Sequence, residues 1–275
     1  MTTDAVPARL IEIIERYPVL AVAVSGGVDS MVLAHVVWSW TRTRLVAFHA
    51  ASPAVPAAAT ERVRDHARRF GWDLRIVDAG ELDDPTYRAN PVDRCFFCKS
   101  RLYGRIRTAI DLPTASGTNL DDLGDYRPGL KAAEEHGVVH PFVEAGLCKS
   151  DVYAMATALG LDDLAVLPAQ PCLASRIETG LAVDAATLAF VERVEAALTP
   201  LLPGAMHVRC RVTAAGIVVE ADPLPAADKI DAVVSLATHL CAEAGRAFGG
   251  LRSYRRGSAF LRPASRDTGE RVPAS

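Results

Sequence analysis

The sequence predicts an α/β fold, a doubly wound parallel sheet followed by a small C-terminal α+β domain. Three observations carry this prediction. An unbroken apolar run at 19–24 is typical of a parallel strand covered on both faces. A glycine turn and a helical pattern follow it, and this strand-then-helix order recurs, which implies right-handed βα units. After Gly180 the pattern changes to one helix, a hairpin and a second helix.

The elements of the first domain follow in order. Strands are expected at 19–24, 45–48 and 74–77, with helices at 31–40 and 56–70. Four arginines of the second helix are expected to face water, namely Arg62, Arg64, Arg68 and Arg69. The alternation continues with strands at 113–117 and 138–142 and helices at 127–136 and 150–159. Ser150 is the expected N-cap of the last helix.

The second domain is shorter and differently patterned. Its expected elements are a helix at 184–198, a hairpin at 206–212 and 216–220, a helix at 226–243 and a returning strand at 246–251. We therefore place a first domain at 1–177 and a second at 178–262. The polar tail 263–275 is expected to be disordered.

Composition excludes several classes of protein. With 275 residues, 50% of them hydrophobic, the chain can bury a core in each of about two domains. Thirty basic against 33 acidic residues give a net charge of -3, which argues against a protein that coats nucleic acid. No apolar run approaches the ~18 residues of a membrane span, and the N-terminus does not resemble a signal peptide. We therefore expect a cytoplasmic protein with neither a membrane nor a nucleic acid as partner. Because disulfides are rare in the cytoplasm, the six cysteines indicate metal binding, an iron–sulfur cluster or redox chemistry rather than structural disulfides.

The motif SGGVDS joins the first strand to the first helix. Gly26 and Gly27 allow close approach of the backbone to a ligand, and the helix N-terminus favours an anion. The hydroxyls of Ser25 and Ser30 can donate to phosphate oxygens. Asp29 suits either a Mg²⁺ ligand or an N-cap, and a simple capped glycine turn is the structural alternative. The motif is not a Walker A loop, since GxxxxGK[ST] is absent.

Cysteines form a second constellation. Cys95 and Cys98, in NPVDRCFFCK, are three positions apart and can share one helical turn, and Cys172 stands in PCLASR. A four-cysteine zinc site would need a second CxxC, whereas three thiolates suit a [4Fe–4S] cluster with one open iron. The alternative is an apolar CFFC and an unrelated cysteine. Cys148, Cys210 and Cys241 are expected to be inert.

Taken together, the motifs resemble a known family. SGGVDS is similar to the PP-loop of the ATP pyrophosphatase superfamily, of the adenine nucleotide alpha hydrolase-like fold. With NPxDRCxxCK, GDYRPGLKA and PCLASR in this order, the chain resembles the LarE family of ATP-dependent sulfur transferases from about residue 8 to about 262. The resemblance implies that Ser25, Gly26, Gly27, Asp29 and Ser30 hold the pyrophosphate of ATP with Mg²⁺. It also implies that Ala50, Ser52 and Gly117 lie at the nucleotide, and that the chain forms hexamers.

What the family implies is adenylation and then thiolation of pyridinium-3,5-biscarboxylic acid mononucleotide, a precursor of the nickel-pincer cofactor of lactate racemase. Cys172 matches a cysteine that some members consume as sulfur donor, whereas others carry three cysteines and a [4Fe–4S] cluster. Cys95 and Cys98 favour the cluster here, since a one-cysteine mechanism does not need them, and both mechanisms stay open. A tRNA thiolase and a non-catalytic nucleotide sensor or iron–sulfur carrier are the rival functions.

The nucleotide substrate carries a phosphate and two carboxylates, so cations must converge on it. Guanidinium groups pair well with phosphate. The candidate substrate-binding residues are Arg127, Lys131, Arg176, Arg209 and Arg211. For Arg209 and Arg211, which alternate along one strand, the alternative is the exposed face of an edge strand.

Overall fold

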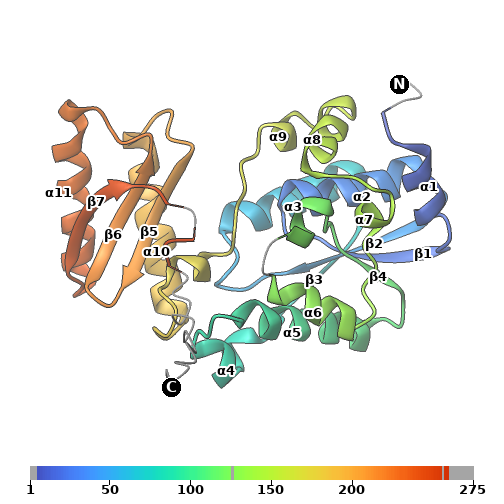
Figure 1. Ribbon diagram of the computed structural model, residues 1–275, viewed down its shortest axis with the longest axis horizontal. Coiled ribbons are helices and arrows are strands. Elements are labelled where there is room, and N and C mark those ends of the chain that lie inside the picture. Colours follow the sequence, from blue (N-terminus) through green and yellow to red (C-terminus); the bar gives the residue numbers. More distant parts are fainter. Residues whose placement is uncertain (1–4, 125–126, 256, 260–275) are drawn as a thin grey trace, which may run out of the picture.

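A computed structural model describes residues 5–124, 127–255 and 257–259. The expected disordered tail and two positions of the GDYRPGLKA motif, 125–126, lie outside the described residues. The first domain is built on a four-stranded, all-parallel sheet with helices on both faces (Figure 1). The second contains a small mixed sheet. The expected fold class is therefore confirmed.

The central sheet has the order β3-β2-β1-β4. Its strands are β1 (Val19–Ala23), β2 (Arg44–Ala50), β3 (Asp73–Val77) and β4 (Thr114–Ala115). The chain moves outward from β1 to β3 and then returns to the other side of β1. Such a reversal opens a crevice at the carboxyl ends of β1 and β4, where ligands of open α/β sheets bind.

Alternate residues of β1 enter two different cores. Leu20 and Val22 pack with α1 (Ala8–Ile14), α2 (Val28–Trp40), α3 (Ala57–Phe70), α8 (Lys149–Ala158) and α9 (Asp162–Ala165). Ala21 and Ala23 face the opposite side, against α5 (Arg94–Ala109) and α6 (Pro128–Glu135). Burial on both faces explains why the strand is a continuous apolar run rather than an alternating one.

Two local expectations are wrong. The segment 138–142 is not a strand: Val139 alone bridges Ala115, and α7 (Pro141–Glu144) begins at once, because Pro141 has no N–H to give to a ladder. Ser150 does not cap its helix, since α8 begins at Lys149 with Cys148 as N-cap. The Asp151 carboxylate accepts the Cys148 N–H, at 2.8 Å, and so closes that end of the helix.

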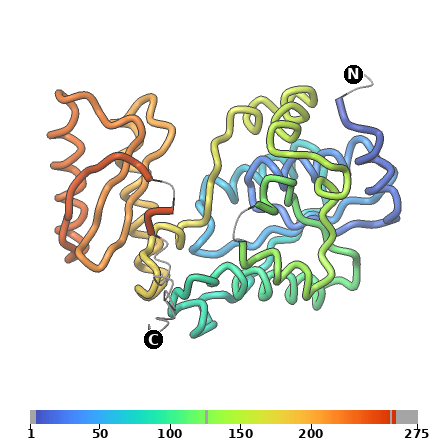
Figure 2. The backbone as a smooth tube through the Cα atoms, in the orientation of Figure 1, coloured from blue at the N-terminus to red at the C-terminus, as the bar shows by residue number. Residues whose placement is uncertain are grey.

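Several connecting segments of the chain contain short helices. They are η1 (Glu81–Asp83), α4 (Pro85–Arg88), η2 (Leu120–Gly124) and η3 (Leu173–Arg176). Figure 2 shows how the chain then passes through a yellow segment into the second domain, drawn in orange and red.

The second domain packs two helices on a three-stranded sheet. Its elements are α10 (Ala185–Leu198), η4 (Thr199–Leu201), β5 (His207–Thr213), β6 (Gly216–Asp222), α11 (Ala227–Glu243) and β7 (Phe248–Ser253). β5 and β6 form the expected antiparallel hairpin, and β7 adds parallel to β6. The core of this domain also takes in Ala54 and Tyr87 from the first domain, so the two domains share buried surface. Within the described ranges, every helix is too short or too polar to cross a membrane.

Candidate active site

The SGGVDS loop lies at the crevice between β1 and β4, and two glycines make its close packing feasible. Gly26 has a φ of 80°, and a Cβ there would lie 2.5 Å from the carbonyl oxygen of Ala59 in α3. A Cβ on Gly117, which follows β4, would lie 2.6 Å from backbone atoms of Asp29 and Ser30. Real Cβ atoms do not tolerate such contacts. Gly117 is thus brought to the loop, as the sequence prediction requires.

Within the loop, hydroxyl groups hold the backbone in place. Ser30 Oγ accepts the N–H of Ser25 at 3.0 Å and donates to the carbonyl of Gly27 at 3.2 Å. The N-cap of α2 is Gly27, and no side chain caps this helix end. The N–H groups of its first turn therefore remain available to an anion. Because Gly27 is the N-cap, the alternative role of Asp29 as N-cap is wrong, and Asp29 stands in the first turn.

Asp29 is paired with two residues that the sequence did not single out. Its Oδ2 accepts from Lys149 Nζ at 2.5 Å, and its Oδ1 accepts from Asn119 Nδ2 at 3.1 Å. Lys149 comes from the first turn of α8, and Asn119 follows β4. The carboxylate side chain is still 28% exposed, so a ligand can reach it.

Arg62 is not a solvated residue, and the expectation that it faces water is wrong. Its Nη1 donates to the carbonyl of Gly26 at 2.8 Å and contacts Gln170 Oε1 at 3.2 Å. Burial lowers the pKa of this guanidinium below its ordinary value. The side chain thus joins the phosphate loop to the segment just before Cys172. The other three arginines of α3 are exposed, as expected.

A hollow of about 440 Å³ lies beside the end of β2. It is lined by Ala51, Ser52, Pro53, Val55, Ala57, Thr60, Glu61, Arg64, Ala189 and Glu192. Glu192, from α10, accepts the N–H of Ala57 at 2.6 Å and closes one side of the hollow. Of the segment predicted to lie by adenine, 50–52, Ala51 and Ser52 thus line this hollow, whereas Ala50 does not.

The three cysteines come from two segments. Cys95 and Cys98 lie in the first turns of α5, on the turn that the sequence predicted, and Cys172 is the N-cap of η3. Burial, and after it the charge of Cys172, raises the pKa of both α5 thiols, that of Cys98 to about 12. Cys98 and Cys172 also pack against the same apolar cluster.

Across the described ranges, no three Cys, His, Asp or Glu side chains meet at a point that could hold one metal ion. This disfavours a single zinc ion. A [4Fe–4S] cluster sets a different requirement, because each thiolate binds a separate iron, so the thiols need only surround a common volume. Cys95, Cys98 and Cys172, all of them half-buried thiols, are compatible with that requirement. Since their raised pKa keeps Cys95 and Cys98 protonated, binding to iron would release protons.

Asn90 ties the cysteine helix to the domain boundary. It is buried, in the left-handed region with a φ of 55°, and its side-chain amide donates to the carbonyl of Glu178 at 2.9 Å. Its own carbonyl accepts from Gly180 N–H, and its side-chain oxygen accepts from Arg94 in α5. The position of Cys95 and Cys98 therefore depends on the backbone around 177–180.

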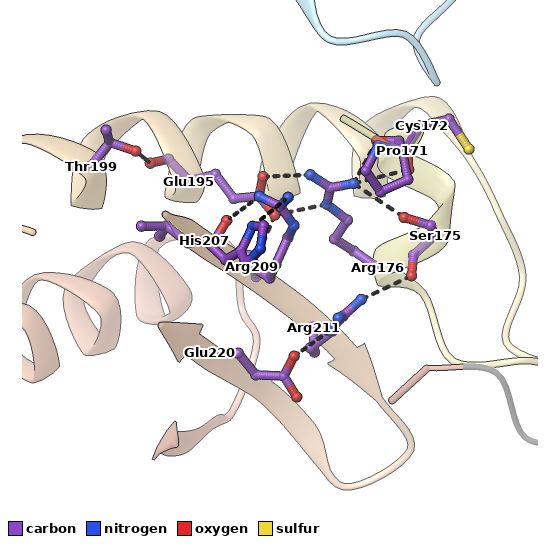
Figure 3. Close-up of polar contacts among 12 residues, drawn as sticks. Pro171, Cys172, Ser175, Arg176, Glu195, Thr199, His207, Arg209, Arg211 and Glu220 are labelled. Carbon is purple, nitrogen blue, oxygen red and sulfur yellow. Dashed lines mark hydrogen bonds and ion pairs between the residues drawn. The ribbon is translucent and has the colours of Figure 1, made fainter. Parts of the chain in front are cut away.

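Three of the candidate arginines gather near Cys172 (Figure 3). Arg176 is buried and donates to both oxygens of Glu195, at 2.9 and 3.0 Å. Arg211 is buried too and donates to Glu220 at 2.7 Å. Buried ion pairs thus occupy both, which limits their freedom to bind an anion.

Arg209 differs from these two. Its guanidinium contacts the carbonyls of Val208 and Ala169 and lies over the Tyr254 ring, and within the described ranges it forms no ion pair. Burial and the nearby Arg176 lower its pKa. Among these three arginines, Arg209 is therefore the one whose charge is not balanced by an ion pair with a carboxylate in the described ranges.

The remaining two candidates lie at α6. Arg127 pairs with Asp122 at 2.8 Å. Lys131 is exposed, 3.9 Å from Glu135, and its Nζ lies 5.6 Å from the ring centroid of Phe96, between Cys95 and Cys98 in sequence. The structure thus places Lys131 beside the cysteine motif.

Comparisons with known proteins identify relatives that match between 56% and 74% of this chain. No family model matches the chain. It is 38% identical over 194 residues to the uncharacterized protein slr1717 of Synechocystis, covering 69% of this chain and 71% of that protein. It is 26% identical over 207 residues to the uncharacterized protein MJ0830 of Methanocaldococcus jannaschii, covering 74% of this chain and 78% of that protein. It is 31% identical over 160 residues to pyridinium-3,5-bisthiocarboxylic acid mononucleotide synthase of Lactiplantibacillus plantarum, covering 56% of this chain and 58% of that protein.

Proposed function

We propose that this chain, which belongs to one family with the Synechocystis protein slr1717, is an ATP-dependent sulfur transferase that thiolates pyridinium-3,5-biscarboxylic acid mononucleotide. Its similarity to the Lactiplantibacillus synthase supports membership of the LarE family and a sulfurtransferase activity. One structural observation carries the finer proposal. Arg62 contacts both the phosphate loop and the segment that leads to Cys172, so a phosphate site and a sulfur site adjoin in one molecule.

Adenylation is the first proposed step. A carboxylate resists attack by a sulfur nucleophile because oxide is a poor leaving group, and transfer of AMP supplies a good one. The loop 25–30 binds the pyrophosphate portion of ATP through backbone N–H groups and hydroxyls. Asp29 provides a carboxylate for Mg²⁺. Lys149 and Arg62 are the nearest cations, and they counter the charge of the departing pyrophosphate.

The hollow beside β2 is the proposed adenosine pocket. It adjoins α3, whose first turns pack on the phosphate loop, so a nucleotide can span both. Ala51 and Ser52 supply one wall and α10 of the second domain supplies another.

Sulfur transfer is the second proposed step. Cys95, Cys98 and Cys172 would hold a [4Fe–4S] cluster, which when bound would supply the sulfur-transfer chemistry. The residues of the chain orient the acceptor: Arg209 pairs with the substrate phosphate, and Lys131 and Arg127 attract its carboxylates. Arg176 and Arg211 act as positioning residues that hold the segment of Cys172 and the strand of Arg209.

The phosphate loop is tested by Asp29→Asn. We expect it to abolish pyrophosphate release while the fold and the iron content stay unchanged. The control is Asp228→Asn, which removes an exposed first-turn carboxylate from α11 and should change nothing. Pyrophosphate release at the wild-type rate in Asp29→Asn contradicts the assignment of the loop. Supplying tRNA instead of the mononucleotide tests the rival thiolase function.

The sulfur source is tested by Cys95→Ala. If the thiols bind one cluster, the variant loses iron and sulfur transfer but still cleaves ATP to pyrophosphate. If Cys172 is consumed, the variant completes one turnover and its intact mass falls by one H₂S. The same mass loss in the wild-type protein, loaded with iron and given ATP and substrate, overturns the cluster.

A further inference from the structure

Two buried polar side chains beside the three cysteines each have, within the described ranges, an atom without a hydrogen-bond partner. Glu81, in η1, is 2% exposed, and Tyr87, in α4, is 1% exposed. In the part of the chain that the structure describes, neither Glu81 Oε2 nor the Tyr87 hydroxyl has a partner. Neither side chain belongs to the machinery proposed above.

Several observations place this pair at the cysteine site. Tyr87 belongs to the same packed cluster as Cys98 and Cys172. The Tyr87 phenol donates a hydrogen bond through its O–H. Glu81 acts electrostatically on both Tyr87 and Cys98. The pair and the thiols therefore share one small volume, where η1 and α4 pack on α5.

Buried polar atoms without a partner are rare, because leaving one unsatisfied costs about 1–3 kcal/mol. Two such atoms at one place indicate a ligand that satisfies both. The ligand must accept a hydrogen bond from the Tyr87 O–H and donate one to the Glu81 carboxylate. A phosphate would be repelled by the carboxylate, and a bare metal ion would meet the hydroxyl proton.

We propose that Glu81 and Tyr87 form a binding subsite for hydrogen sulfide, in its neutral form H₂S, next to Cys98 and Cys172. The sulfur atom accepts from Tyr87, and its S–H donates to Glu81. Arg94 and Lys99, both within electrostatic reach of the site, offset the negative charge. The inference rests on the proposed function for its purpose, since it supplies the sulfur that the transferase would deliver.

The test is anaerobic equilibrium dialysis of the full-length chain against ³⁵S-labelled sulfide, as purified and after removal of iron by a chelator. We expect saturable binding of one sulfide per chain. Tyr87→Phe and Glu81→Met, which keep the volume and remove one hydrogen bond each, should weaken it about tenfold. The control is Tyr103→Phe, a buried tyrosine of α5 whose hydroxyl is not one of the unpartnered atoms, and it should bind as the wild type does.

Melting temperatures provide a second measurement of sulfide binding. Sulfide should raise that of the wild type and of Tyr103→Phe more than those of the two subsite variants. If the iron-free wild type binds no sulfide, water alone satisfies the pair and the proposal is wrong. Unchanged affinity in both variants overturns it as well. Pyrophosphate release, measured in parallel with the mononucleotide, reports on the proposed function separately, because it needs neither Glu81 nor Tyr87.

Discussion

Acid should destabilise this protein through one buried histidine, His35. The ring lies in α2, 3% exposed, with His35 Nε2 2.7 Å from His66 Nδ1, and His66 Nε2 in turn contacts Asp163 at 2.9 Å. The rings of Phe70 and Trp72 pack edge-on against it. Burial, and then the charges of His66 and Arg69, lowers the pKa of His35 to about 3, although Asp163 opposes the shift.

The sign of the effect follows from that depressed pKa. The folded protein keeps His35 neutral, whereas the unfolded chain takes up a proton below about pH 6.5. The contribution of His35 is therefore complete above pH 6.5 and is lost as the pH falls towards 3. Each pH unit in this window removes about 1.4 kcal/mol. Because the unfolded ring is already half protonated at pH 6.5, the loss between pH 6.5 and 4.5 is about 2 kcal/mol, a sizeable share of a typical stability of 5–15 kcal/mol.

Urea unfolding at pH 7.5, 6.5, 5.5 and 4.5 measures this loss. His35→Gln removes the titrating ring and keeps an amide donor for His66. We expect the variant to be less stable at pH 7.5 but to lose about 2 kcal/mol less than the wild type between pH 6.5 and 4.5. His239→Gln, on the exposed face of α11, is the control and should follow the wild type. Parallel curves for His35→Gln and the wild type would refute the reasoning, since carboxylates contribute equally to both.

Three more outcomes are expected. Gly117→Ala should weaken ATP binding more than tenfold by calorimetry, because its Cβ meets the backbone of Asp29 and Ser30. Glu220→Gln leaves the buried Arg211 charge unbalanced and should cost about 3–5 kcal/mol in urea unfolding, whereas Glu243→Gln, in an exposed pair with Arg193, should cost under about 1 kcal/mol. Lys149→Met should slow pyrophosphate release about 10- to 100-fold at an unchanged melting temperature, and Lys149→Arg should restore part of it.

The sequence predicted those structural features that depend only on residues close together in the chain. The run 19–24 indicated a strand buried on both faces, and the glycines of SGGVDS indicated the loop at its end, because both features depend on backbone geometry over a few positions. The CxxC turn was predictable for the same reason. The prediction of a strand at 138–142 was wrong because the apolar pattern favours a strand, whereas Pro141 begins a helix.

Partners from distant segments could not be predicted. Lys149 meets Asp29 across 120 positions, because α8 packs against α2 in the folded chain. Arg62 has the same sequence context as the exposed arginines around it, and its burial depends on how α3 meets the loop. The ion pairs of Arg176 and Arg211 were missed because a list of cations does not reveal which carboxylates face them.

The anchoring of Asn90 at the domain boundary has a consequence for how the protein comes apart. The groups around Asp29 all belong to the first domain, whereas Cys95, Cys98 and Cys172 stay together only while the backbone at 177–180 holds the cysteine helix. Partial opening of the second domain would separate the thiols and leave the loop 25–30 intact. Mild heating or limited proteolysis should therefore yield a species that keeps the loop 25–30 folded after its sulfur chemistry is gone. Separation of the thiols and unfolding of the loop at different temperatures would reveal two cooperative units in one chain.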